Sequence, residues 1–578
     1  MNNEFVLGID CGGTHTDAAL IQINKDEKKA RLCGAAKTDT IHEALEKSVS
    51  EVIGNLAAQA GLSDILTQIS RVTLGTTLAV NALVQGKGEK VGLALSAGPG
   101  LDPSHFTIGE HFCIVPGGLD HRGVEVGRLD LQKLKKTASA WPEEGVRAAA
   151  SVGKFSPRNP EHELEMAKII SQETSLSVSC GHSLSGRLDF PRRIATAYYN
   201  AAVQQLHHNF LNSVRSSFRN CGINAQARLL RADGGAIPFH ISGNQPVQSI
   251  LSGPAASVMG ALAMWEGANS GCALLLDVGG TTTDLALVLN GSPVVDRLGM
   301  RIGGRRTLVR SLASLSIGVG GDSLIRAIPE KDGGIKIVTG PYRGGPAAAF
   351  GGNAPTLLDA LNYLDRPKEV AKRGNVEASR RAMEKFATTF QGMDATQCAN
   401  LAVENALNSI QAALQTLLDN INAHPVYTLA ALRESRNIKP EKACVAGGPA
   451  ACLRGRLEKV LKLPVALAPH SDVTNAIGAA LTLPTASLEV YADTGKRELS
   501  APTLDYKEQI SAAYNLEDAV DAAKRLLAKK MRDDGMEREL LEIANADMFA
   551  TLDDMGRGSK DLRVTVQARP GIAAVLEN

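Results

Sequence analysis

The stretch that decides the fold is LGIDCGGTHTDAALI at Leu7–Ile21, and a matching stretch, LLDVGGTTTDLALV, stands at Leu275–Val288. Each copy is an apolar run that ends in Asp, followed by a Gly-Gly-Thr turn, a Thr-Asp pair and a second apolar run. Short apolar runs broken by glycine are typical of buried strands around a turn. We therefore expect the same β-hairpin twice, once near the N-terminus and once near the middle of the chain.

The Gly-Gly-Thr turns favour an anionic ligand. Glycines let a backbone approach a ligand closely, and successive N–H groups in a turn form a nest for anions. A strand-ending Asp beside this nest suits a hydrated Mg²⁺ better than a bare phosphate, because two anions would repel each other. A plain hairpin explains either copy taken alone. Two matched copies instead predict two related lobes that each offer a loop to one nucleoside triphosphate.

Length and composition narrow the class of protein. A chain of 578 residues exceeds one hydrophobic core, so several domains are expected. Its 62 basic and 61 acidic residues give a formal charge of +1, which offers no electrostatic case for nucleic acid or a membrane as partner. The nine cysteines are scattered without zinc-type spacing. Because neither a signal peptide nor a membrane span is recognised, we expect a soluble, cytoplasmic enzyme.

The rest of the chain is expected to alternate strands with helices. Residues 100–190 are polar and irregular and predict little regular structure. The expected domains are 1–190 with the first phosphate loop, 191–490 with the second, and 491–578 as an accessory segment. Strands are predicted at 71–74, 90–96, 228–231 and 562–567, and helices at 41–60, 191–219, 376–422, 473–482 and 516–532.

Two later glycine turns complete the candidate site. ACVAGGPA at Ala443–Ala450 predicts a strand, a Gly-Gly turn and a helix start, against which an adenosine can lie flat. The glycine loop at Ile317–Ser323 contains Asp322, which either belongs to a turn or faces the γ-phosphate. Asp10 and Asp277 are expected to bind Mg²⁺ or its waters. The expected catalytic residues are Asp10, Thr14, Asp277 and Asp322, and the expected ATP-binding residues are Gly12, Gly13, Thr14, Gly279, Gly280, Thr281, Thr282, Gly320, Gly321, Gly447 and Gly448.

The paired Asp-x-Gly-Gly-Thr motif with a late Gly-Gly turn resembles the superfamily of actin, sugar kinases and heat-shock chaperones. That resemblance implies an α/β fold of two ribonuclease-H-like lobes with a nucleotide cleft between them. More narrowly, the chain resembles the A-type subunits of the hydantoinase/oxoprolinase family. The matching stretches are Gly8–Leu20, Leu74–Leu83, Ala232–Pro238, Ile250–Gly260, Asp277–Leu287, Ile317–Ser323, Tyr342–Asp359 and Val445–Ala450.

This family includes ATP-dependent 5-oxoprolinase, N-methylhydantoinase and the ATP-binding subunits of acetone and acetophenone carboxylases. The resemblance implies that ATP and Mg²⁺ are used to phosphorylate a carbonyl oxygen of a cyclic amide or ureide. It also implies hydrolysis with a B-type partner subunit, in a homo- or hetero-oligomer. The loop at Gly98–Asp102 and the segment Arg187–Arg193 depart from the family pattern. Because both are expected to border the small-molecule carbonyl substrate, the substrate's identity stays open.

Three alternatives to a hydrolase also stay open. One is the ATP-binding subunit of an acetone-type carboxylase. Another is a small-molecule kinase of the same superfamily, which would need a carboxylate base near the acceptor hydroxyl. The third is an ATP-driven conformational switch such as a reductase activator. Activators of that kind carry an iron–sulfur cluster between subunits, and the scattered cysteines argue against one.

Overall fold

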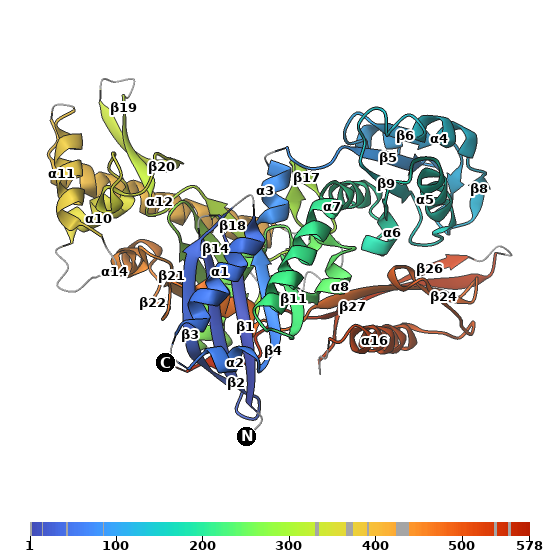
Figure 1. Cartoon of the computed structure of the whole chain (residues 1–578). Helices are drawn as coiled ribbons and strands as arrows, with labels where there is room; N and C mark the ends of the chain where they lie inside the picture. The colour runs from blue at the N-terminus through green and yellow to red at the C-terminus, as the bar shows by residue number, and fades with distance from the viewer. Residues whose placement is uncertain are drawn as a thin grey trace.

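The structure is a computed structural model of a mixed α/β protein (Figure 1). Within its described residues, no helix is both long and apolar enough to span a lipid bilayer. It describes residues 3–13, 15–41, 44–59, 61–84, 86–296, 298–329, 334–365, 374–389, 392–423, 438–536, 540–552 and 556–577.

The two expected hairpins are confirmed. In the first hairpin Asp10 lies opposite Asp17, and in the second Asp277 lies opposite Asp284, so the two copies share one register. Their inward-facing side chains are buried aliphatic residues, which is why each apolar run forms a strand. The strands are β1 (Asn3–Cys11) and β2 (His15–Asn24), then β13 (Cys272–Val278) and β14 (Thr283–Leu289).

Each hairpin lies inside a larger sheet, and the two sheets share one strand arrangement. The first sheet runs β12-β11-β4-β1-β2-β3-β28, and the second runs β15-β14-β13-β21-β22 with β18 also pairing with β14. The edge strands β12 and β15 are Ala236–Pro238 and Ser292–Pro293. In both sheets, two successive parallel strands lie beside the first hairpin strand. An antiparallel strand lies beside the second hairpin strand. These neighbours are β3 (Lys29–Asp39), β4 (Ile69–Thr76) and β11 (Gln226–Leu230), then β18 (Ser314–Ile317), β21 (Lys442–Ala446) and β22 (Val465–Leu467).

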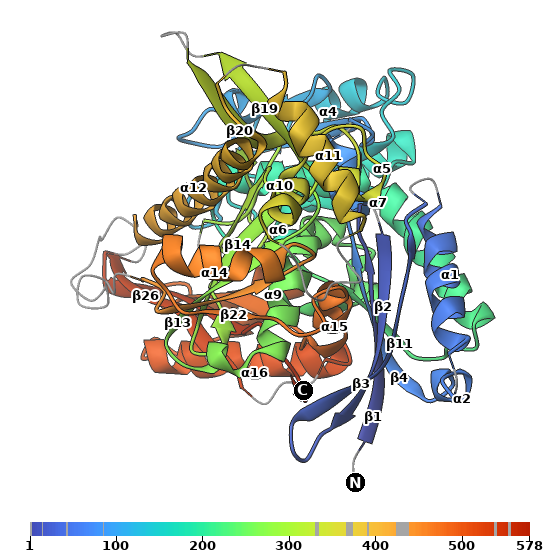
Figure 2. The ribbon, with the colours of Figure 1, turned by 90° about the vertical axis from the view of Figure 1, so that its left-hand side faces the viewer.

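Two helices rich in small residues lie between the sheets. Figure 2 shows α15 (Thr474–Leu481) between α9 (Ser252–Met264) and the strands of the first sheet. One hydrophobic core joins both helices to both sheets, with Val6 and Ile21 on one side and Leu275 and Val288 on the other. The helices are therefore the structural link between the two glycine turns.

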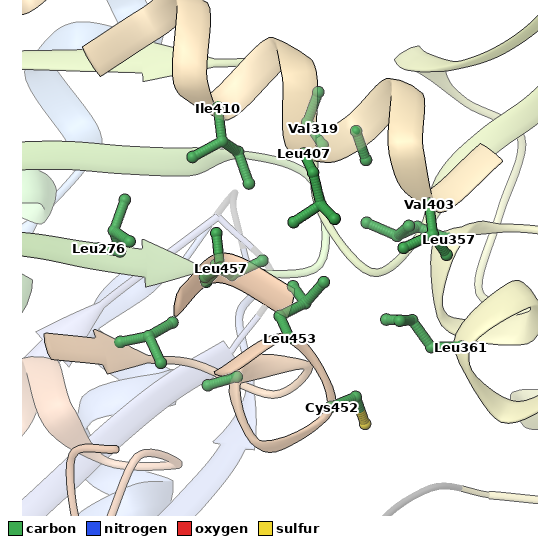
Figure 3. Close-up of a cluster of buried hydrophobic side chains, with 14 of the residues drawn as sticks. Leu276, Val319, Leu357, Leu361, Val403, Leu407, Ile410, Cys452, Leu453 and Leu457 are labelled. Carbon is green, nitrogen blue, oxygen red and sulfur yellow. The ribbon is translucent and has the colours of Figure 1, made fainter. Parts of the chain in front are cut away.

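The second sheet is covered on its other side by α12 (Ala395–Asn422) and α14 (Ala450–Leu461). Val403, Leu407 and Ile410 recur along α12 at helical spacing and point toward a core that includes Leu276 and Leu457 (Figure 3). The helical periodicity predicted over 376–422 is confirmed as two helices. These are α11 (Val376–Ala387) and α12.

The expectation of irregular structure over residues 100–190 is wrong. A second α/β unit lies there, with four parallel strands in the order β10-β9-β5-β6. Its β9 reads AAASVG, and such small residues have weak strand propensity, so burial under two helices decides the conformation. The elements are β5 (Val91–Ser96), β6 (Phe112–Val115), β9 (Ala148–Gly153), β10 (Val178–Cys180), α4 (Leu131–Ala138) and α5 (Glu161–Thr174).

The C-terminal segment forms a five-stranded antiparallel sheet in the order β25-β24-β23-β27-β26, with α16 packed on it. Its strands include β24 (Glu498–Ala501), β25 (Tyr506–Gln509) and β26 (Glu542–Leu552). The predicted helix 516–532 and strand 562–567 are confirmed as α16 (Leu516–Asp533) and β27 (Gly558–Ala568). The last strand, β28 (Val575–Leu576), returns to pair with β3 of the first sheet.

The domain division at residues 190 and 490 stays a prediction, and hydrogen-bonded sheets run across both positions. Strand β11 lies beyond the first position but belongs to the first sheet, and β23 (Ala486–Asp493) spans the second. The predicted long helix is α7 (Phe190–Asn220), and the helix predicted over 41–60 is α1 (Leu45–Ala57).

Candidate functional site

The two Gly-Gly turns close in the same way. The Gly12 N–H donates to the His15 carbonyl at 3.0 Å, and the Gly279 N–H donates to the Thr282 carbonyl at 2.9 Å. These bonds use the first glycine of each turn and leave the second, Gly13 or Gly280, exposed at the tip. Thr14, expected to act in catalysis and phosphate binding, lies outside the described residues.

Asp10 is the penultimate residue of β1 and is buried, with one carboxylate oxygen that accepts no hydrogen bond from the described residues. The residue is 4% exposed, and its Oδ2 accepts a hydrogen bond from Asn475 Nδ2 at 2.9 Å. Its Oδ1 is buried and has no hydrogen-bond partner among the described residues. A Cβ added at Gly75 would collide with that Oδ1, so glycine at the end of β4 makes room for the carboxylate.

The electrostatics around Asp10 favour a cation. Burial, with smaller contributions from the carboxylates of Asp17 and Asp277, raises the pKa of Asp10 to about 6. Burial also raises the pKa of Asp277. Lys37 lies 3.1 Å from Asp17, but no ion pair of Asp10 or Asp277 is found among the described residues. Because a buried carboxylate without a counter-ion is costly, a bound cation would stabilise this arrangement.

Asp277 is the penultimate residue of β13, the equivalent strand of the second sheet, and is held by different neighbours. Its Oδ2 accepts a hydrogen bond from the Ser257 hydroxyl on α9. Gly447 packs against it with φ of +99°, and a Cβ there would collide with the Val278 carbonyl. Gly447 is therefore required by the backbone. Gly448, at the start of α14, is exposed with open space at its Cβ position.

The third glycine loop packs on the second turn. The N–H of Gly321 donates to the Gly279 carbonyl at 2.9 Å, and the N–H of Gly320 donates to Ser323 Oγ at 2.8 Å. Both N–H groups are thus engaged within the protein, and a direct contact of Gly320 or Gly321 with a ligand stays a prediction. The loop's evident structural task is to support the second turn.

Asp322 lies beside the second turn but is already paired. A Cβ added at Gly280 would lie 2.9 Å from Asp322 Oδ2, so the two residues are neighbours. Arg343 Nη2 donates to Oδ2 at 3.0 Å, and the Ala347 N–H donates to Oδ1 at 3.2 Å. These contacts place the Asp322 carboxylate at the edge of the site. Whether Asp322 acts only as a turn residue or also faces the γ-phosphate stays a prediction.

The structure brings Asp10 and Asp277 together through two residues that the sequence analysis did not single out as site residues. Asn475 and Ser257 connect the two carboxylates by hydrogen bonds. Ser257 falls inside the family-matching stretch 250–260, which is a weak signal, and Asn475 falls in a helix with no local signal at all. Within the described part of the chain, no three His, Cys, Asp or Glu side chains form a metal site by themselves.

A mixed α/β protein with two matched glycine hairpins, each with an aspartate near the end of its first strand, is therefore the class that fold and site define. The family model for the hydantoinase/oxoprolinase N-terminal region matches residues 6–174, and the hydantoinase/oxoprolinase model matches residues 193–487. Together these cover well over half of the chain. The chain belongs to the hydantoinase/oxoprolinase family.

Relatives within this family have several named activities. Caprolactamase subunit alpha of Pseudomonas jessenii is 27% identical over 62% of this chain and 55% of its own length. The acetophenone carboxylase gamma subunit of Aromatoleum aromaticum is 24% identical over 62% and 53%. Arabidopsis thaliana 5-oxoprolinase 1 is 25% identical over 48% and 25%. The chain thus spans about half the length of the first two relatives and less of the third.

Two solved structures share the fold. An ATP-dependent caprolactamase from Pseudomonas jessenii superposes with a TM-score of 0.72 and 20% identity, over 98% of this chain and 87% of that one. A nucleotide-free acetone carboxylase superposes with a TM-score of 0.65 and 17% identity, over 99% and 88%. At these identities the likeness concerns the fold alone.

Proposed function

We propose that the two sheets are the lobes of an actin-like ATPase and that ATP binds with Mg²⁺ between the two Gly-Gly turns. The observation that carries the proposal is the buried Asp10 carboxylate, whose Oδ1 has no hydrogen-bond partner in the described part of the chain and whose neighbour across the site is Asp277. The repeated turn geometry supports it, because both copies expose a second glycine at the tip.

The residues present suit Mg²⁺ that arrives with ATP. Mg²⁺ keeps several waters and uses one or two carboxylates together with substrate phosphates, so a three-acid cage is not needed. Asp10 and Asp277 would hold the ion or its waters, and the ion would neutralise charge on the γ-phosphate. The exposed turns would bind phosphate oxygens through Gly13, Thr14, Gly280, Thr281 and Thr282, and adenosine would lie against Gly447 and Gly448.

The proposed reaction is ATP-dependent opening of a cyclic amide or ureide of hydantoin, lactam or 5-oxoproline type. Amide resonance makes the carbonyl carbon a poor electrophile. Transfer of the γ-phosphoryl group to the carbonyl oxygen leaves ADP and turns that oxygen into a leaving group. Water then adds to the carbon, and collapse of this adduct breaks the ring C–N bond, with the nitrogen taking up a proton, and leaves an acyl phosphate. A second water hydrolyses the acyl phosphate to the carboxylate and phosphate. The chain's share is to orient the substrate and the phosphates.

A partner subunit is part of the proposal. The caprolactamase and acetophenone carboxylase relatives are themselves named as subunits. We infer that a B-type subunit completes hydrolysis in a hetero-oligomer. The carboxylase relative supports one alternative, in which the activated oxygen belongs to a ketone enolate and bicarbonate is the second substrate.

The test measures phosphate release by the purified chain, alone and with a B-type subunit. A hydantoin, 5-oxoproline, a lactam and acetone with bicarbonate serve as candidate substrates. A ring compound should stimulate ATP consumption and yield an opened product. EDTA should abolish the activity, and added Mg²⁺ should restore it. Stimulation only by ketone with bicarbonate would favour the carboxylase, and a stable phosphorylated product would favour a kinase. No stimulation by any compound would contradict the proposal.

A further inference from the structure

A chain of hydrogen bonds runs from the first turn to the second through the two helices between the sheets. Asn475 Nδ2 donates to Asp10 Oδ2 at 2.9 Å. The Ser257 hydroxyl lies 2.7 Å from Asn475 Oδ1 and also contacts Asp277 Oδ2. One amide on α15 and one hydroxyl on α9 therefore connect carboxylates that stand 267 positions apart in the sequence.

The direction of these bonds follows from chemistry. An ionised Asp10 carboxylate only accepts, so Asn475 must present its NH₂ group to it and turn its Oδ1 toward Ser257. The Ser257 hydroxyl has one hydrogen and three acceptors within reach, which are Asn475 Oδ1, Asp277 Oδ2 and, at 3.5 Å, the Gly253 carbonyl of its own helix. It can donate to only one of them at a time. A cation or proton bound to Asp277 therefore changes which acceptor the Ser257 hydroxyl bonds to. This in turn changes the hydrogen bonding of Asn475, the residue that donates to Asp10.

The backbone around this bridge is packed without intervening side chains. A Cβ added at Gly8 would collide with the Ala476 carbonyl of α15. A Cβ at Gly260 of α9 would collide with the Thr474 carbonyl, and one at Gly478 would collide with the Ala256 carbonyl. These three glycines bring β1, α15 and α9 into direct backbone contact, which leaves the bridge little freedom to adjust.

The bridge residues stand on the faces that these glycines bring together. Asp10 lies two residues after Gly8 on one face of β1. Ser257 lies three residues before Gly260, and Asn475 three before Gly478, so each is one helical turn from a close contact. Because α9 and α15 pack so closely, the side chains of Asn475 and Ser257 are long enough to connect the carboxylates of Asp10 and Asp277.

We propose that Asn475 and Ser257 are positioning residues that fix the two loop aspartates relative to each other. On the proposed function, this couples the two lobes, so that a metal–nucleotide complex engaged by one loop also orients the other. Neither residue is assigned contact with the reacting atoms. A purely structural role in packing α9 on α15 is the alternative, and the two roles differ in what conservative substitutions do.

The experiment compares Asn475→Ala, Ser257→Ala and the double variant in MgATP hydrolysis by the full chain with its partner subunit. Each single change should lower kcat about tenfold, while the Kd for MgATP, measured by equilibrium fluorescence titration, should change less than about threefold. The double variant should be no slower than the slower single variant, because both break one bridge. Ser217→Ala, which removes a buried helix hydroxyl that bonds to Glu46, is the matched control and should retain the wild-type rate.

Two further substitutions separate positioning from packing. Asn475→Asp keeps the size of the side chain but removes the NH₂ donor and adds a negative charge beside Asp10. It should be slower than Asn475→Ala, whereas a packing role would make it the milder change. Ser257→Thr keeps the hydroxyl and should recover most of the activity lost in Ser257→Ala.

The outcomes distinguish this inference from the proposed function. If the wild-type complex hydrolyses MgATP and both alanine variants retain kcat within about twofold, the positioning role of Asn475 and Ser257 is refuted and the proposed function stands. Additive losses in the double variant would refute it as well. If the wild-type complex neither binds nor hydrolyses MgATP, the proposed function fails, and the coupling that rests on it fails too.

Discussion

Replacing Asp10 by Asn should stabilise the ligand-free protein while abolishing ATP hydrolysis. Asn keeps the shape of the side chain and can still accept from Asn475, but it removes the buried charge. Burial raises the pKa of Asp10 from 3.8 to about 6, so the folded state binds the proton more tightly than the unfolded state does. Stability therefore falls as pH rises through this window, and the ionised carboxylate is destabilising above it.

The increase in the free energy of unfolding on replacing Asp10 by Asn follows from the difference between the folded and unfolded pKa values of Asp10. At 1.36 kcal/mol per pKa unit, a shift of about two units corresponds to about 3 kcal/mol at pH 7.5. At pH 5 the folded carboxyl is mostly protonated, and the gain from Asn should shrink to about 1.5 kcal/mol. A change of this size corresponds to a few degrees in the unfolding midpoint of a large domain.

The assay is thermal unfolding in EDTA without nucleotide, from pH 5 to pH 8.5, for the wild-type protein and Asp10→Asn. The control is Asp322→Asn, because Asp322 is already paired with Arg343 and its loss should not stabilise the fold. An unfolding midpoint of Asp10→Asn that lies below wild type, or a difference that does not grow with pH, would refute the reasoning. Retained MgATP hydrolysis in this variant would refute the assigned role of Asp10.

Two glycine substitutions test the backbone of the site. Gly75→Ala forces a methyl group against Asp10 Oδ1 and should lower kcat at least tenfold and stability by about 1–3 kcal/mol, measured by hydrolysis and unfolding. Gly54→Ala, in an open position of α1, is its control and should be neutral or stabilising; equal damage from both would contradict the assignment. Gly447→Ala strains a backbone at φ +99° and should weaken MgATP binding at least tenfold in a fluorescence titration. Gly448→Ala should fold normally, and normal MgATP binding by Gly447→Ala would count against an adenosine site there.

Local pattern was sufficient for the hairpins and for the three longest helices that the structure describes. Apolar runs around Gly-Gly-Thr specify strand, turn and strand within some fifteen residues, and helical periodicity marks α7, α12 and α16 over longer windows. The region 100–190 was not predictable in this way. Its strands are short, and β9 is made largely of small residues, so its conformation depends on the helices that bury it.

The sequence by itself determined which acids lie just before the two glycine turns, namely Asp10 and Asp277, and which strands flank those turns. Only the tertiary structure decided that Asn475 and Ser257 connect these acids, and that Gly75 makes room for one of them. The physical reason is range. A strand or turn is specified by neighbours in the chain, whereas a hydrogen bond between residues 465 positions apart depends on how β1, α9 and α15 pack. No local sequence pattern predicts how these three elements pack.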